Sequence, residues 1–108
     1  MFAITEETCR IGRIEISTYK CGVESANILE VGVGTNGYQG GDGGHGSRTY
    51  FRIKDLASTE MEVRVMWDKY GCEGFEVTLG SDCELVTIIT AFKFIAKVLE
   101  DGAKEVHG

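Results

Sequence analysis

A histidine and an acidic residue close together in sequence are the first candidates for chemistry in this chain. Of the two histidines, His45 lies three residues after Asp42 inside a glycine-rich segment, and His107 lies beside the last residue. A histidine oriented by a carboxylate is a common general base in enzymes. One histidine and one aspartate complete neither a nucleophile–base set nor a metal site. We therefore favour a binding protein over an enzyme, and we expect no bound metal or cofactor.

The glycine-rich segment from 34 to 48 is the most unusual feature of the sequence. Seven of the thirteen residues from 34 to 46 are glycine, whereas glycine makes up about 7% of an average protein. Glycines let backbone N–H groups approach a ligand closely and form a nest for an anion. We predict that this segment binds an anionic small molecule such as a nucleotide. The predicted site residues are Asn36, Tyr38, Asp42, Gly43, Gly44, His45, Arg48 and Tyr50.

Two other interpretations of this segment remain open. The segment could order on a protein partner, as the loop of an inhibitor or adaptor does, or it could be an Ω-loop that binds no ligand. Phosphate-binding motifs do not decide between them. No G-x-x-x-x-G-K-[ST] is present, and the G-x-G-x-x-G at 32–37 is not followed by a helical pattern.

The charge balance and the cysteines restrict the partners and the compartment. Seventeen acidic residues against eleven basic ones give a net charge of −6, which disfavours binding to duplex nucleic acid. No run of 18 apolar residues predicts a membrane span, and the N-terminal residues do not resemble a secretory signal. The four cysteines contain no C-x-x-C pair. We therefore expect free structural thiols in a cytoplasmic protein.

Alternation of apolar and polar residues predicts five strands. The pattern covers the segments 10–18, 29–33, 48–54, 61–68 and 75–79. Strands with one apolar and one polar face are typical of an antiparallel sheet covered on one side. Short connections containing glycine indicate that consecutive strands pair as a meander. The 108 residues are thus expected to form one α+β domain, residues 1–108, with a five-stranded, mainly antiparallel sheet.

A C-terminal helix of about 20 residues is predicted to cover one face of that sheet. Ser81 and Glu84 have the spacing of a capping box, and Gly102 stands where a helix would end. The side facing the sheet is predicted to carry Leu85, Ile88, Ile89, Phe92, Ile95, Ala96 and Leu99. A second apolar row lies beside it and predicts the interface of a homodimer or higher oligomer. The residues of this row are Val86, Phe94 and Val98.

Overall fold

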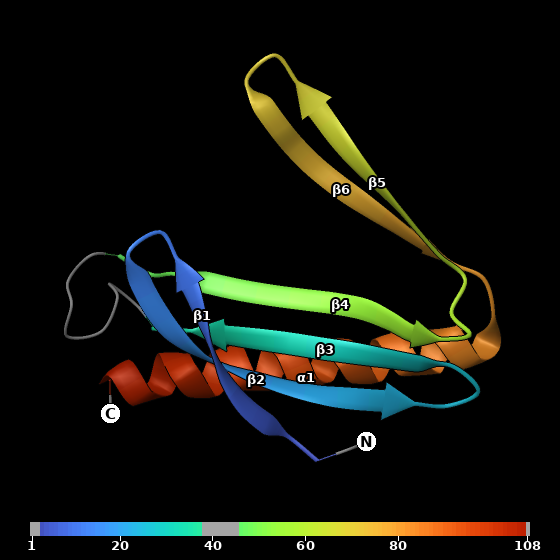
Figure 1. Ribbon diagram of the computed structural model, residues 1–108, viewed down its shortest axis with the longest axis horizontal. Helices are drawn as coiled ribbons and strands as arrows, with labels where there is room; N and C mark the ends of the chain where they lie inside the picture. Colours follow the sequence, from blue (N-terminus) through green and yellow to red (C-terminus); the bar gives the residue numbers. More distant parts are fainter. Residues whose placement is uncertain (1–2, 38–45, 108) are drawn as a thin grey trace.

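The structure, a computed structural model, describes residues 3–37 and 46–107. In these ranges the chain forms two antiparallel sheets and one helix (Figure 1). The elements are β1 (Thr5–Ile11), β2 (Ile14–Glu24), β3 (Ile28–Thr35), β4 (Thr49–Ala57), β5 (Met61–Asp68), β6 (Gly71–Leu79) and α1 (Asp82–His107). Sheet A contains β1 to β4 in chain order. The strands β5 and β6 pair only with each other and form a separate hairpin, called the arm below.

The predicted α+β class, antiparallel sheet and C-terminal helix are confirmed, whereas the single five-stranded sheet is wrong. The segment 10–18, predicted as one strand, contains the end of β1, a turn and the start of β2. Gly12 in this turn has a φ of 64°, which glycine adopts without steric cost. The second difference follows β4. There Ser58 has a φ of 61°, and β5 leaves sheet A instead of pairing with β4.

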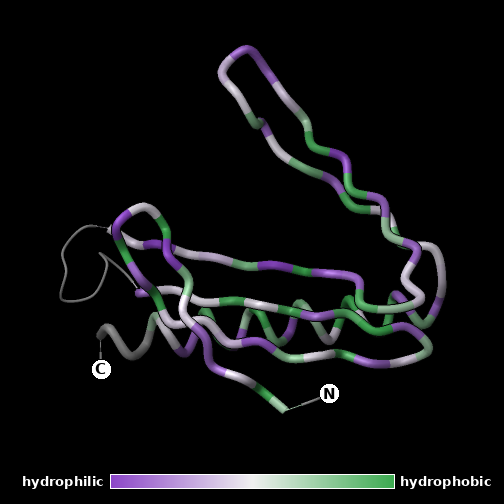
Figure 2. Tube along the Cα trace, in the orientation of Figure 1, coloured by the Kyte–Doolittle hydropathy of each residue, from purple (hydrophilic) through white to green (hydrophobic). Residues whose placement is uncertain are grey.

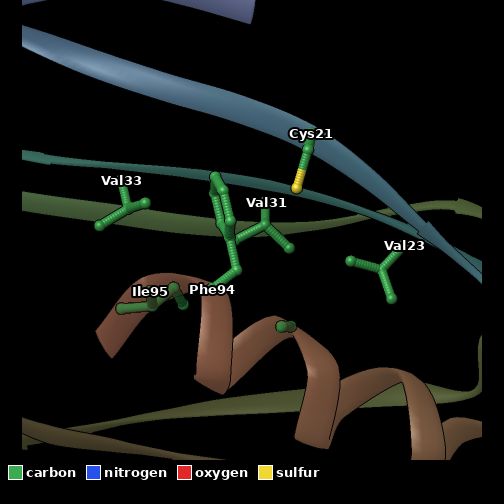
Figure 3. Close-up of a cluster of buried hydrophobic side chains, with 7 residues drawn as sticks. Cys21, Val23, Val31, Val33, Phe94 and Ile95 are labelled. Atoms are coloured by element: carbon green, nitrogen blue, oxygen red, sulfur yellow. The ribbon is translucent and has the colours of Figure 1, made fainter. Parts of the chain in front are cut away.

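The core lies between α1 and the middle of sheet A. The helix runs along β3 and beside β2, as Figure 1 shows. Because successive side chains of a strand point to opposite faces, every second residue of these strands meets the helix. Figure 3 shows the resulting cluster. It consists of Cys21, Val23, Val31, Val33, Ala91, Phe94 and Ile95.

The helix is rotated about its axis relative to the prediction. Leu85, Ile89 and Phe92, expected to face the sheet, are exposed, whereas the side chain of Phe94 is only 7% exposed. Of the three residues predicted to form an oligomer interface, Phe94 therefore belongs to the core. Val98 packs beside that core, and Val86 is exposed. The assignment of Phe94 to an exposed row is wrong, because its ring packs against the strands of sheet A.

A buried polar contact accounts for this rotation. Asn27, in the turn between β2 and β3, donates a hydrogen bond from Nδ2 to Oγ1 of Thr87 at 3.1 Å, and both residues are fully buried. A buried amide without a partner costs about 1–3 kcal/mol. The side of α1 that carries Thr87 must therefore face the sheet. Hydrophobic spacing alone does not show which of two neighbouring apolar rows of similar size faces the sheet. The hydrogen bond between Asn27 and Thr87 decides this.

The two ends of α1 differ in how well the sequence predicted them. The capping box is confirmed, because Oγ of Ser81 accepts a hydrogen bond from the backbone N–H of Glu84 at 3.4 Å. Gly102 does not end the helix, which continues to His107. A Cβ atom on Gly102 would lie 2.8 Å from Cγ2 of Thr35. Glycine is thus needed here for the close approach of α1 to the end of β3.

Candidate functional site

Hydrogen bonds between the end of β3 and the start of β4 close the neck of the glycine-rich segment. The backbone N–H of Arg48 donates to Oδ1 of Asn36 at 2.7 Å, and the N–H of Asn36 donates to the carbonyl of Arg48 at 3.2 Å. The hydroxyls of Thr35 and Thr49 lie 3.2 Å apart beside this pair. The side-chain oxygen of Asn36 thus holds the backbone of Arg48 in place.

A depression of about 550 Å³ lies next to this neck. Its lining combines the turn between β1 and β2 with the first residue after the glycine-rich segment. The lining residues are Ile11, Gly12, Arg13, Ile14 and Arg48. Two arginines that are 35 positions apart in the sequence therefore border one hollow, with two isoleucines beside them. Guanidinium groups bind carboxylates and phosphates through two parallel hydrogen bonds.

The side chain of Arg48 is held by local carbonyl groups. Its Nη1 atom lies 3.4 Å from the carbonyl oxygen of Gly46 and 3.3 Å from that of Ser47. These distances are long for an N–H···O hydrogen bond, whose usual range is about 2.7–3.2 Å. These contacts place the guanidinium group beside the backbone of residues 46 and 47.

The predicted site residues have different locations in the structure. Arg48 lines the depression, and Asn36 supports it from the neck. Tyr50 lies on β4, where its hydroxyl accepts a hydrogen bond from Nη1 of Arg52 at 3.2 Å. The other predicted residues, Tyr38, Asp42, Gly43, Gly44 and His45, lie outside the described residues. The sequence analysis did not include Arg13 among the site residues. Gly12, which precedes Arg13 and marks a turn, was the signal that pointed to this position.

Charged residues on the face of sheet A opposite α1 pair across the strands. Arg52 contacts Glu30 at 2.6 Å, and Lys20 contacts Glu7 at 2.8 Å. The hydrogen bond from Lys20 lowers the pKa of Glu7 and raises that of Lys20. Burial disfavours the charge of Arg52, but Tyr50 and Glu30 outweigh this effect and raise its pKa. These paired charges stabilise the polar surface of sheet A.

A second candidate surface is the apolar side of the arm. In the register of β5 with β6, Val63 lies opposite Val77 and Val65 lies opposite Phe75. Figure 2 shows the alternation of hydrophobic and hydrophilic residues along both strands. The exposed apolar residues on this side, called the arm face below, are Val63, Val65, Trp67, Phe75 and Val77. The opposite side carries polar residues such as Arg64 and Glu76, which form an ion pair at 2.7 Å.

The carboxylate of Glu84 holds both strands of the arm at their base. Oε2 accepts a hydrogen bond from the backbone N–H of Glu60 at 3.1 Å, and Oε1 accepts one from the N–H of Gly80 at 3.0 Å. Oε2 also accepts one from Oγ of Ser81 at 3.1 Å. The backbone donors of Gly80 and Glu60 hold the pKa of Glu84 below its usual range. A single side chain thus caps α1 and fixes the direction in which the arm leaves the body.

The described residues contain neither a cluster of metal ligands nor a helix that could span a membrane. Within residues 3–37 and 46–107, no three His, Cys, Asp or Glu side chains gather as ligands for a metal ion. No described helix is long and apolar enough to cross a membrane. The four cysteines are free thiols. Burial raises the pKa of Cys21, which lies in the core.

Comparison with known proteins adds no relative from which a function could be transferred. No protein-family model, no curated protein and no solved structure matches this chain.

Proposed function

We propose that this protein binds an anionic small molecule in the depression between the β1–β2 turn and the neck of the glycine-rich segment. The observation that supports the proposal is that Arg13 and Arg48, far apart in sequence, line the same hollow. Their guanidinium groups would bind a phosphate or carboxylate group of the ligand. Ile11 and Ile14 would contact an apolar part of it. A nucleotide combines both kinds of group, and we propose this class of ligand first.

The hydrogen bonds at the neck support this proposal because they restrict the position of Arg48. Asn36 binds both backbone polar groups of Arg48, so less entropy is lost when a ligand orders this residue. The net charge of −6 repels anions at long range, whereas contacts inside the hollow act at short range. The free thiols favour a reducing compartment, and we propose the cytoplasm as the location of the protein.

The alternative function is that of a protein-interaction module. The version in which the glycine-rich segment orders on a partner remains a prediction, because residues 38–45 lie outside the described residues. The described residues favour a different contact surface, the arm face, since its apolar side chains are exposed.

Thermal unfolding in the presence of defined anions tests the ligand proposal. ATP, GMP and inorganic phosphate are added separately, and the shift in melting temperature is measured for the wild type and for Arg13→Ala and Arg48→Ala. A ligand at a hundredfold excess over its Kd stabilises the fold by about 2.7 kcal/mol. We expect this gain for a nucleotide, a smaller one for phosphate, and none for either variant.

Arg64→Ala is the matched control, because it removes the same charge from the exposed polar side of the arm. It should respond to the nucleotide as the wild type does. A wild type that none of the three anions stabilises would contradict the proposal. An equal loss of response in Arg64→Ala would show that the effect depends on total charge rather than on this hollow.

A further inference from the structure

The arm has a surface that its own chain leaves largely uncovered. Trp67 is 69% exposed and Phe75 is 55% exposed, although Phe75 meets the ring of Phe51 on β4 at 6.3 Å between centroids. Figure 1 shows the arm extending away from sheet A and α1. A hairpin of two strands is only marginally stable in water unless its apolar side packs against something. The arm therefore needs a partner surface.

The arm cannot fold back freely to cover its own face. The bonds from Glu60 and Gly80 to Glu84 fix both of its strands at the base. Oγ1 of Thr59, just before β5, accepts a hydrogen bond from Nδ2 of Asn27 at 2.9 Å. A surface that covers the arm face therefore has to approach the arm where it stands, as a second molecule can.

The chain exposes more surface than a compact monomer of its mass. The accessible surface is 7353 Å², whereas a compact monomer of 11.8 kDa exposes about 5,900 Å². The radius of gyration is 15.3 Å, against about 13 Å for a compact domain of this length. The excess is about 1,400 Å² per chain, or about 2,900 Å² for two chains, and obligate homodimers bury about 2,000–5,000 Å².

The helix supplies a second apolar surface of similar length. Its exposed row recurs at spacings of three and four residues and is called the helix row below. The helix row consists of Leu85, Ile89, Phe92 and Ala96. From Leu85 to Ala96 it measures about 17 Å at 1.5 Å per residue. The arm has room for this length, because the four residues on its apolar side from Met61 to Trp67 span about 20 Å.

From these observations we infer that the protein forms a twofold homodimer in which the arm face of each subunit packs on the helix row of the other. The twofold axis repeats this arm-on-helix contact, because residue i of one chain meets residue j of its partner and j meets i. Both apolar surfaces of both chains are then covered at once. A different partner on the arm would leave the helix row exposed. This interface is separate from the depression at Arg13 and Arg48 and does not depend on the proposed ligand.

The charges beside the arm face also favour a second copy over a charged partner. The polar side of the arm carries both signs, and Arg64 and Glu76 neutralise each other across the strands. The arm carries four acidic and two basic residues, so neither sign alone covers it and selects a partner of the opposite charge. The contact is therefore apolar at its centre with mixed charges at its rim, as homodimer interfaces usually are.

The molar mass in solution, measured by light scattering on a sizing column, tests this inference. The wild type should have twice the monomer mass of 11.8 kDa. Val65→Lys on the arm face and Ile89→Lys on the helix row should each elute at the monomer mass. Both side chains are exposed within one subunit, so the far-UV circular dichroism should keep its folded shape. Thr78→Lys, opposite Glu62, introduces the same charge on the polar side of the arm and should remain dimeric.

Mixing the two monomeric variants distinguishes arm-on-helix from arm-on-arm packing. A mixed dimer of Val65→Lys with Ile89→Lys combines both substitutions in one contact and leaves the other contact intact. We therefore expect the mixture to regain part of the dimer mass that each variant alone has lost. A monomeric wild type would overturn the inference. An Ile89→Lys variant that stays dimeric would overturn it as well, because the helix row would then lie outside the interface.

Discussion

Replacing Asn27 by alanine tests whether one buried amide holds the helix, the sheet and the base of the arm together. Nδ2 of Asn27 donates to Thr87 at 3.1 Å and to Thr59 at 2.9 Å. Each bond contributes about 0.5–1.5 kcal/mol, and the loss of buried side-chain volume adds to this. The hydroxyl of Thr87 keeps the carbonyl of Glu84 as a partner at 3.1 Å, so no buried group is left unpaired there. We expect the free energy of unfolding to fall by about 2–3 kcal/mol.

Urea unfolding followed by circular dichroism measures this change, with all samples at one protein concentration because an oligomer couples stability to concentration. For a domain of this size, 2–3 kcal/mol corresponds to a decrease in Tm of about 8–12 °C. Ser25→Ala in the same turn is the control, since Ser25 is exposed, and it should stay within about 0.5 kcal/mol of the wild type. A loss below about 0.5 kcal/mol in Asn27→Ala would refute the argument that this amide sets the rotation of α1.

Three further predictions follow from the packing and the pKa directions. In Gly34→Ala the new Cβ would collide with the carbonyl oxygen of Ser17. The free energy of unfolding should therefore fall by about 3 kcal/mol or more in the same urea assay. A variant as stable as the wild type would contradict the register of β2 with β3. The folded pKa of Glu84 lies below its ordinary value of 4.5, so the stability that it contributes is present above pH 4.5 and is lost as the pH falls below it. Acid titration should therefore destabilise the wild type more than Glu84→Gln, and parallel curves would exclude a role for this carboxylate. Cys21 is buried with a raised pKa, and it should react with iodoacetamide far more slowly than the exposed Cys72 at pH 8, as peptide mapping of the labelled protein would show.

The alternation of apolar and polar residues predicted most strands of this fold, because each strand of the core has one covered side. It did not predict β1, where the sequence TEETCRI is almost entirely exposed and has no apolar side to alternate. Nor did it predict that the arm leaves the sheet. A strand pattern identifies which side is apolar, but it does not identify the neighbouring strand that covers this side.

The helix and the site show the same limit. The capping box is a local pattern, and it was predicted correctly from Ser81 and Glu84. The inward side of α1 depends on Asn27, which is sixty residues away from its partner Thr87 in the sequence. In the candidate site Arg48 was predicted from its place beside the glycines. Arg13 was missed because it reaches the same hollow only through the pairing of β2 with β3 and of β3 with β4.

The separation between the strands of the core and the helix that covers them has a consequence for synthesis of the chain. At about 5–20 residues per second, translation needs about 3–12 s to proceed from Asn27 to Thr87. During this interval Val31 and Val33 have been made, but the helix that buries them has not. The nascent chain thus carries an uncovered apolar strand surface for several seconds, and transiently exposed apolar surface of this kind promotes aggregation. Slower translation between β4 and α1 should therefore lengthen this exposure and lower the yield of folded protein in the cell.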